Sequence, residues 1–441
     1  SVYAARYSYC FVIFQIIIIM KKASWILIIT MLACGALGQN FNYFDTSFYS
    51  PVLDTTKDMR IFLPPGYELD TCSYPVVYYL HGATGTYQEV LGILPEIQDM
   101  IDTGYINPVL VVGLDGQCDP FEGSMYTNSV LYGNYEDYII QDAIPFAESI
   151  LRTKDGTDYR SIMGFAMGGY GTMKMAFKHK DMFAGAASYN GPLQLDTLFQ
   201  LWWPEVLGEN TGPPYQYAYG AGIFTILMFT GAGGLSPNLS LLPYQVEFPY
   251  DQDGYFVDSV MQKWKMHCCC RLAKDIDPSE YYPGLFFACG INDFLYFHPG
   301  NVCFADTLEH LGLDHEFLTT NDGHVISDEI LIAGMHFLDS VMHDSIMTGT
   351  VNPVAIKHQE YGTYPNPFTQ FTSFSFTITE PSRVLIQIFN SQGQFIEKKE
   401  MMKPAGKHKV NWSAKGLSPG LYYYKMLIGS QALSGKMVLV Q

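Results

Sequence analysis

Short apolar segments recur along the first three quarters of this chain, and turn-forming residues follow each of them. They span residues 76–80, 109–114, 161–163, 184–188, 285–289 and 313–318. Several are apolar throughout, which is typical of strands buried on both faces of a sheet. Helix-length stretches lie between them, at 136–152, 168–180, 302–311 and 327–342. This alternation predicts an α/β fold with a doubly wound, mostly parallel sheet and helices on both faces.

Residues 191–282 interrupt the alternation. This stretch is rich in Pro, Gly and aromatic residues, among them Trp202, Trp203 and Tyr215. An insertion between core strands commonly covers a binding site, and ligands of such folds bind beyond the carboxyl ends of the strands. We therefore expect a cap-like insertion over a site at that edge of the sheet.

A glycine-flanked turn follows the segment 161–163. It contains Gly164, Ala166, Met167 and Gly168 and leads into a predicted helix. A tight turn of this kind between a strand and a helix is the setting of the nucleophile elbow, G-x-S-x-G. Ala166 occupies the position of the serine.

Two further residues follow in the order of a catalytic triad. Asp293 comes just after the segment 285–289, and His324 lies in the loop after 313–318. Singly, an Asp after a strand is most often a helix cap, and a loop His is most often a solvated turn residue. Their joint placement downstream of an elbow predicts that Asp293 orients His324 as a base.

The first apolar segment ends in a flexible turn that contains His81, Gly82 and Ala83. A backbone amide of this turn is expected to join the amide of Met167 as an oxyanion hole, because both follow neighbouring strand ends.

These motifs resemble the esterases of the α/β-hydrolase superfamily, which include feruloyl and acetylxylan esterases, S-formylglutathione hydrolases and mycolyltransferases. The matching segments are 79–82, 158–162, 164–171, 183–186, 290–294 and 323–324, and the resemblance extends over about residues 52–342. It implies hydrolysis of carboxylic esters, carbohydrate or hydroxycinnamoyl esters among them, with no metal and no cofactor. It also implies Asp293 as the acid, His324 as the base, and Met167 with Gly82 or Ala83 as oxyanion donors.

Ala166 departs from the family pattern, since a methyl group cannot attack an ester. Loss of a serine nucleophile lowers kcat by a factor of about 10⁶. A rate acceleration of about 10³- to 10⁴-fold over the reaction in water then remains. Three origins of the alanine stay open: a natural non-catalytic homologue, a deliberate replacement, or a one-base change of a serine codon. Two functions stay open as well: an esterase that is inactive as written, or a non-catalytic ester- or carbohydrate-binding protein on the same scaffold.

The first forty residues are interpreted as a targeting segment. Lys21 and Lys22 precede an apolar run, 23–37, that ends in small residues, which is typical of a secretory signal peptide over 20–38. Residues 1–19 are interpreted as an untranslated extension upstream of Met20. A membrane anchor formed by 11–19 and 23–37 is the alternative, but the lysine pair separates the two runs. We expect no stable membrane insertion after processing.

The tail has a different composition from the body. Residues 361–441 hold nine Lys or Arg and three Asp or Glu. The whole chain has a net charge of −18, which leaves −24 for residues 1–360. A body this acidic is repelled by phosphate backbones and anionic membranes, so nucleic acid is not an expected partner.

Regularly spaced alternating segments in this tail predict a small β-sandwich after a linker at 346–360. This tail resembles the C-terminal sorting domain of type IX secretion cargo. The matching segments are 364–368, Trp412 and 420–423. The resemblance implies a partner in the secretion machinery and export from a Gram-negative bacterium through the periplasm. A carbohydrate-binding sandwich, with Tyr422 and Tyr424 lining a sugar site, is the alternative.

Seven cysteines lie beyond residue 38: Cys72, Cys118, Cys268, Cys269, Cys270, Cys289 and Cys303. No CxxC spacing occurs, so a zinc site is not indicated. An odd number cannot all pair within one chain, and we expect buried or free thiols, with a single disulfide as the alternative.

Overall fold

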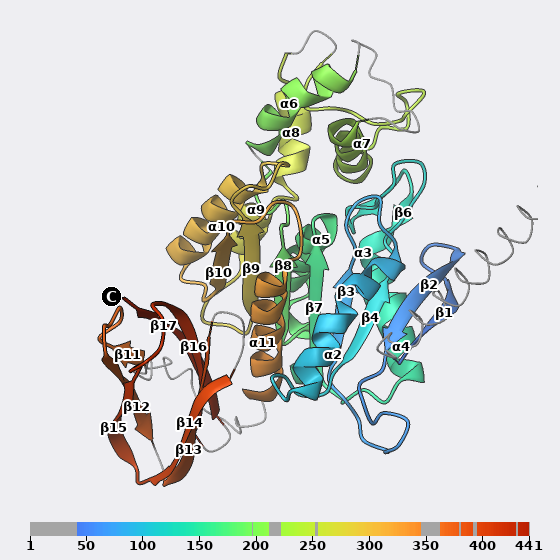
Figure 1. Cartoon of the computed structure of the whole chain (residues 1–441). Coiled ribbons are helices and arrows are strands. Elements are labelled where there is room, and N and C mark those ends of the chain that lie inside the picture. Colours follow the sequence, from blue (N-terminus) through green and yellow to red (C-terminus); the bar gives the residue numbers. More distant parts are fainter. Residues whose placement is uncertain are drawn as a thin grey trace, which may run out of the picture. The chain divides into compact units, whose positions relative to one another are not determined.

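The computed structural model describes residues 42–195, 197–210, 222–251, 255–344, 362–378, 381–390, 395–428 and 431–440. The chain divides into two compact units, residues 1–348 and 349–441 (Figure 1). The segments interpreted as upstream extension (1–19), signal peptide (20–38) and linker (346–360) lie outside the described residues.

An eight-stranded sheet forms the centre of the first unit, in the order β1-β2-β4-β3-β7-β8-β9-β10. Its strands are β1 (Tyr43–Ser50), β2 (Thr55–Phe62), β3 (Val76–Leu80), β4 (Leu110–Leu114), β7 (Arg160–Phe165), β8 (Gly185–Tyr189), β9 (Gly284–Gly290) and β10 (Glu316–Thr320). The strands from β4 to β10 pair in parallel, and β1 and β2 are antiparallel at one edge. The predicted mostly parallel α/β sheet is confirmed.

Helices cover both faces of this sheet. The longer ones are α2 (Leu94–Asp102), α4 (Ile144–Ile150), α5 (Met167–Lys178), α10 (Phe297–Leu311) and α11 (Asp328–Asp344). Successive strand residues alternate between the faces, so Tyr78 joins the core beneath α4, α5 and α10, and Tyr79 joins the core beneath α2 and α11. Both tyrosines are fully buried. Because β3 is buried on both faces of the sheet, its sequence is an uninterrupted apolar run.

Short elements connect the main ones. They are η1 (Tyr87–Gly92), β5 (Asn128–Ser129), β6 (Gly133–Asn134), α3 (Tyr135–Asp137), η2 (Tyr138–Ala143), η3 (Thr157–Tyr159), η4 (Lys180–Met182) and η5 (Ala273–Asp275). The helix predicted over 136–152 is therefore composite, because a π-helical turn, η2, separates α3 from α4.

The strand predicted over 313–318 begins later, at Glu316. Gly312 adopts a left-handed φ of 71° after α10, and the amide of Leu313 donates to the carbonyl of Leu308 at 3.0 Å. This Schellman-type closure keeps Leu313 with the end of the helix.

The insertion 191–282 contributes four helices among its described residues: α6 (Leu198–Glu209), α7 (Ile223–Leu235), α8 (Asp258–Lys265) and α9 (Cys269–Leu272). Figure 1 shows α6, α7 and α8 gathered beyond one end of the sheet. Helix α7 is apolar on nearly every side, which is typical of a helix buried against others. None of the helices in the described ranges is long and apolar enough to cross a membrane.

The second unit consists of antiparallel strands. They are β11 (Gly362–Tyr364), β12 (Phe371–Ile378), β13 (Ser382–Asn390), β14 (Phe395–Lys403), β15 (Gly406–Ser413), β16 (Gly420–Ile428) and β17 (Gln431–Leu439). The sheets have the orders β11-β12-β15 and β14-β13-β16-β17. Phe374, Trp412, Tyr422 and Tyr424 are buried in one core between them, so the predicted β-sandwich is confirmed.

Tyr422 and Tyr424 are therefore core residues and not a sugar-binding surface. Tyr424 packs edge-on against Phe374, with ring centroids 4.9 Å apart, and Tyr423 is the exposed member of the run. The alternation that suggested a carbohydrate site is the ordinary two-residue period of a half-buried strand.

All seven cysteines of the described residues are free thiols. Cys72 and Cys303 are exposed, Cys270 is half-buried, and the others are buried. Burial raises the pKa of the Cys118 thiol to about 12. Within the described ranges no group of three or more His, Cys, Asp or Glu side chains is arranged to hold a metal ion.

Candidate active site

Ala166 lies at the sharp turn between β7 and α5. Its backbone has φ 50° and ψ −115°, a conformation that L residues seldom adopt. The turn is closed on both sides, since the Ala166 amide donates to the Tyr189 carbonyl at 2.9 Å and the Ala166 carbonyl accepts from the Tyr170 amide at 3.0 Å. This is the backbone geometry of a nucleophile elbow.

The glycines that flank the elbow are sterically required. A Cβ atom on Gly168 would lie 1.9 Å from the carbonyl oxygen of Leu80, and one on Gly164 would lie 2.4 Å from the backbone of Gly168. Helix α5 can thus start directly against β3 and β7 only because neither position carries a side chain.

Asp293 and His324 meet beside this turn. The Nδ1 atom of His324 lies 2.8 Å from Oδ2 of Asp293, whose side chain is fully buried. The other carboxylate oxygen of Asp293 accepts the amide of Leu295 at 2.8 Å. Because the ionised carboxylate can only accept, Nδ1 of His324 carries the proton, and Nε2 is left with a lone pair to act as a base.

Aromatic rings hold the imidazole in place. The ring centroids of Phe165, Phe297 and Phe294 lie 4.7, 5.4 and 5.8 Å from that of His324. The His324 side chain is 11% exposed. The ring therefore has few alternative positions.

Asn190 connects the acid loop with the histidine loop. Its side-chain oxygen accepts the amide of Gly290 at 2.9 Å, and its side-chain nitrogen donates to the carbonyl of Val325 at 2.8 Å. Asn190 is fully buried and follows β8 directly. Its role was not predicted, because its partners lie 100 and 135 residues away in the sequence.

The turn after β3 supplies backbone amides. The Gly82 amide donates to the Glu89 carboxylate, at 3.2 Å to Oε1 and 3.3 Å to Oε2. Among the described residues, no protein acceptor receives the amide of Ala83, and Met167 is the first residue of α5, where helix amides have no partner within the helix. Of the two expected donors in this turn, Ala83 is thus the one that is available to a ligand.

His81 fixes the direction of the Ala83 amide. Its Nε2 accepts the Gly116 amide at 2.8 Å, so its Nδ1 carries the proton and donates to the Gly82 carbonyl at 2.7 Å. The Gly82–Ala83 peptide is planar, so the Ala83 N–H points away from the bonded carbonyl. The sequence contained the His81-Gly82 pair but gave no indication of this role, nor of Glu89.

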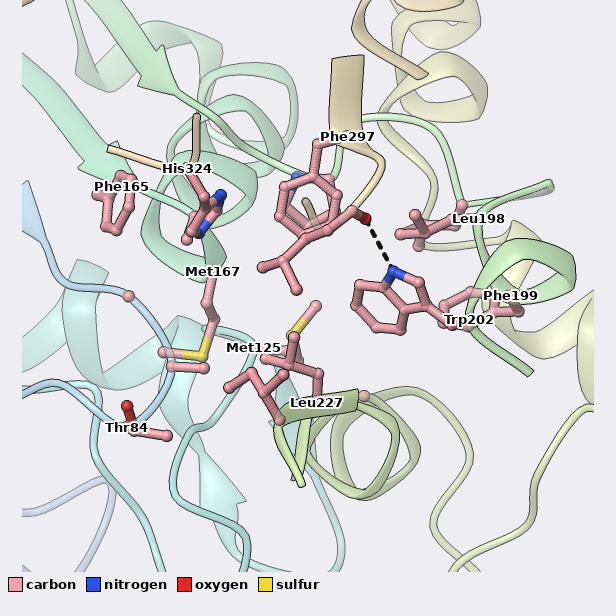
Figure 2. A pocket seen from close by; sticks show the side chains of 18 of the residues that line it. Thr84, Met125, Phe165, Met167, Leu198, Phe199, Trp202, Leu227, Phe297 and His324 are labelled. Atoms are coloured by element: carbon pink, nitrogen blue, oxygen red, sulfur yellow. Dashed lines mark hydrogen bonds between the residues drawn. The ribbon is translucent and has the colours of Figure 1, made fainter. Parts of the chain in front are cut away.

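A cavity of about 200 Å³ joins these groups to the insertion. It is lined by Gly82, Ala83, Thr84, Glu89, Met125, Phe165, Ala166, Met167, Pro192, Leu195, Leu198, Phe199, Trp202, Ile223, Leu227, Gly231, Leu235, Trp264, Phe294, Leu295, Phe297 and His324. Figure 2 shows Met125, Met167, Leu227, Trp202 and Phe297 turned toward a common space, with His324 at one end. The cavity therefore leads from the candidate catalytic groups into α6, α7 and α8.

Residues 50–219 match the family described as "Putative esterase". The first unit therefore contains a segment that is similar to an esterase family. Residues 362–441 match the family described as "Secretion system C-terminal sorting domain", so the second unit is a sorting domain. The sorting domain indicates secretion or cell-surface localisation through the type IX system.

Two relatives match part of this chain. Esterase Rv1288 and Esterase MT1326, both of Mycobacterium tuberculosis (strains H37Rv and CDC 1551), are each 30% identical over 154 residues, which is 35% of this chain. The match spans about a third of the length of these relatives.

Solved structures of similar fold include a ferulic acid esterase (18% identity, TM-score 0.48, 68% of this chain and 98% of that one). A fluorophosphonate-binding serine hydrolase F of Staphylococcus aureus has 18% identity and a TM-score of 0.46, over 69% of this chain and 99% of its own. An S-formylglutathione hydrolase of Agrobacterium tumefaciens has 15% identity and a TM-score of 0.45, over 68% of this chain and 94% of its own.

Proposed function

We propose that the first unit is an esterase-like α/β-hydrolase whose site is arranged for the hydrolysis of carboxylic esters, and that it is inactive as written because Ala166 replaces the serine nucleophile. The observation that carries the proposal is the 2.8 Å contact between Asp293 and His324, because His324 lines the same cavity as the methyl group of Ala166. An aligned acid and base are retained where the attacking oxygen is missing.

Each group has a defined role in the proposal. The ester carbonyl oxygen accepts from the amides of Ala83 and Met167, which stabilise negative charge on that oxygen. His324 would take the proton of an attacking hydroxyl at Nε2, and Asp293 would stabilise the resulting imidazolium. Without a hydroxyl at residue 166, the acyl-enzyme bond cannot form.

The biological setting of the proposal is export from a Gram-negative bacterium through the periplasm. The signal peptide at 20–38 directs the first step, and the sorting domain directs the second after a linker at 346–360. Carbohydrate and hydroxycinnamoyl esters are the substrate classes suggested by the family resemblance.

The second candidate function is a non-catalytic ester- or carbohydrate-binding protein on the same scaffold, in which the catalytic pair is a remnant. Ala166 itself favours this candidate, since a site that binds without turnover does not need the serine. The two candidates differ in whether His324, Asp293 and the two amides are still aligned for chemistry.

Substitution Ala166→Ser distinguishes them. The serine variant should hydrolyse p-nitrophenyl acetate several decades faster than the parent, because about 10⁶ in kcat depends on the nucleophile. It should lose that activity with His324→Ala and become labelled by fluorophosphonates. A folded serine variant that remains as inactive as the parent would support the binding protein. A parent that hydrolyses esters in a His324-dependent way would contradict the role given to Ala166.

A further inference from the structure

We infer that the cavity beneath the insertion receives the acyl part of the ester, and that this acyl group is an apolar chain or a single ring. The inference rests on the proposed function for the position of the carbonyl. It goes further by assigning the chemical class of the group that the cavity holds.

Among the described residues of the insertion, those that line the cavity have no available polar side chain. Helix α6 supplies Leu198, Phe199 and Trp202, helix α7 supplies Ile223, Leu227, Gly231 and Leu235, and helix α8 supplies Trp264. The Nε1 atom of Trp202 donates to the Leu295 carbonyl at 2.8 Å, and that of Trp264 donates to Ser236 Oγ at 2.7 Å. Both indole N–H groups are therefore already occupied.

This composition excludes a sugar from the deep part of the cavity. Each hydroxyl of a sugar that is buried without a partner weakens binding by roughly 5- to 150-fold. Of the described residues that line the cavity, only Thr84, Glu89 and His324 have polar side chains apart from the two indoles, and all three belong to the catalytic end. Polar parts of a ligand are thus confined to that end.

The carbonyl position fixes the direction of the acyl group. Ala83, Met167 and His324 surround the place of the reacting carbonyl, and Leu198, Leu227 and Trp202 line the space on the side of the insertion. Figure 2 shows Leu227 and Trp202 on either side of this space, with Met167 toward His324. An acyl chain attached at the carbonyl therefore extends between α6 and α7.

The volume limits the length of the chain. An apolar cavity of about 150 Å³ holds benzene, so about 200 Å³ accommodates one ring or a chain of roughly six carbons. A long fatty acyl chain exceeds this space.

The test is the acyl-chain dependence of the Ala166→Ser variant. We expect kcat/KM for p-nitrophenyl esters to rise from acetate to hexanoate by at least about tenfold, because each methylene removed from water contributes about fourfold. It should fall again for dodecanoate. A variant that hydrolyses these esters but prefers acetate, or prefers acetylated xylose, would overturn the acyl-pocket inference and leave the proposed function intact.

A direct binding measurement separates the inference from the proposed function. Hexanoate and acetate are titrated into the unaltered protein by calorimetry, which needs no turnover. Tighter binding of hexanoate supports the acyl pocket even if the serine variant is inactive. Equal binding of the two carboxylates, or no binding of either, overturns it.

Substitutions of residues that line the cavity test where the acyl chain lies. Leu227→Trp fills the cavity and should lower the hexanoate-to-acetate ratio, while Leu198→Ala enlarges the cavity and should move the preference to a longer chain. Leu207→Trp is the matched control, because Leu207 is on the same helix as Leu198 but is exposed and does not line the cavity. A shift of the ratio by Leu207→Trp as large as that by Leu227→Trp would contradict the placement.

Discussion

Ala166 has φ 50° and ψ −115°, and its side chain is a methyl group without a hydroxyl. Such a conformation costs an L residue about 1–3 kcal/mol. The contacts described above maintain it, namely the Tyr189 carbonyl that accepts the Ala166 amide and the close approach of Gly168 to Leu80. The elbow is therefore a property of the surrounding fold and does not depend on the nucleophile.

Replacement of Ala166 by glycine should stabilise the domain. Glycine adopts this conformation without steric cost, although it loses more backbone entropy on folding, so we expect a gain of about 1 kcal/mol in the free energy of unfolding. Urea denaturation of the two proteins measures it. A loss of stability would show that the turn is not strained.

The individual site residues differ in how far the sequence could predict them. Asp293, His324 and Met167 follow strand ends, which meet at one edge of the sheet. His324 and Met167 line one cavity there, and Asp293 contacts His324. Glu89 and Asn190 could not be found in the same way. Each acts by holding a backbone group, and the identity of that group appears only when the loops are packed together.

At the level of elements, the parallel strands were predictable and the first hairpin was not. Strands β1 and β2 carry charged residues that conceal the apolar pattern. Arg60 is buried and pairs with Asp45 through two contacts of 2.7 and 2.8 Å, and buried Lys57 pairs with Asp115 at 2.8 Å. Such residues appear as surface positions in a sequence, because the ion pairs that permit their burial form only in the fold.

Helix α5 approaches strand β3 closely at Gly168, which lies against Leu80. Gly168→Ala should lower the free energy of unfolding by at least about 2 kcal/mol, because the new Cβ would meet the Leu80 carbonyl oxygen and the backbone must shift. Gly92→Ala is the control, since nothing lies within 4 Å of a Cβ at that position. Thermal unfolding of both variants distinguishes a steric effect from a general intolerance of alanine.

A buried ion pair joins α5 to the short helix α3. Lys174 is fully buried, and its Nζ lies 2.8 Å from a carboxylate oxygen of Glu136, which also pairs with Lys178 and His179. Burial opposes ionisation of Glu136, but the hydrogen bonds from His179, Lys174 and Lys178 prevail and hold its pKa well below the usual range. The unfolded state therefore binds more protons than the folded state in mild acid, so the stabilising contribution is present above about pH 4.5 and is lost as the pH falls below it.

Glu136→Gln should consequently destabilise the domain at pH 7 by about 3–5 kcal/mol, because it leaves the ammonium of Lys174 buried without its counter-charge. The variant should also lose part of the decline in stability between pH 5 and pH 3. Denaturation curves at several pH values measure both effects. Parallel pH dependence of the two proteins would contradict the role of Glu136.

The two units of the chain differ in net charge and in the family that each of them matches. Residues 1–360 carry −24 and residues 361–441 carry +6, and the first unit matches an esterase family while the second matches a secretion sorting domain. This division was predictable, since composition and strand spacing both change near residue 361.

Transport should remove both ends of the chain. A signal peptide and a sorting domain are recognised during export, so we expect the mature body to begin near Gln39 and to end between residues 347 and 361. Intact-mass analysis of secreted material tests this expectation. Free soluble protein that still contains the basic tail would contradict the processing of the sorting domain.

Such processing would leave an intrinsic optical reporter of the cavity. The chain has five tryptophans: Trp25 in the predicted signal peptide, Trp412 in the sorting domain, and Trp202, Trp203 and Trp264 in the insertion. Trp202 and Trp264 line the cavity, and Trp203 stacks on Tyr250 with ring centroids 4.6 Å apart. The tryptophan emission of the mature body would then arise from the insertion alone. Its intensity and wavelength would follow the filling of the cavity without any added dye.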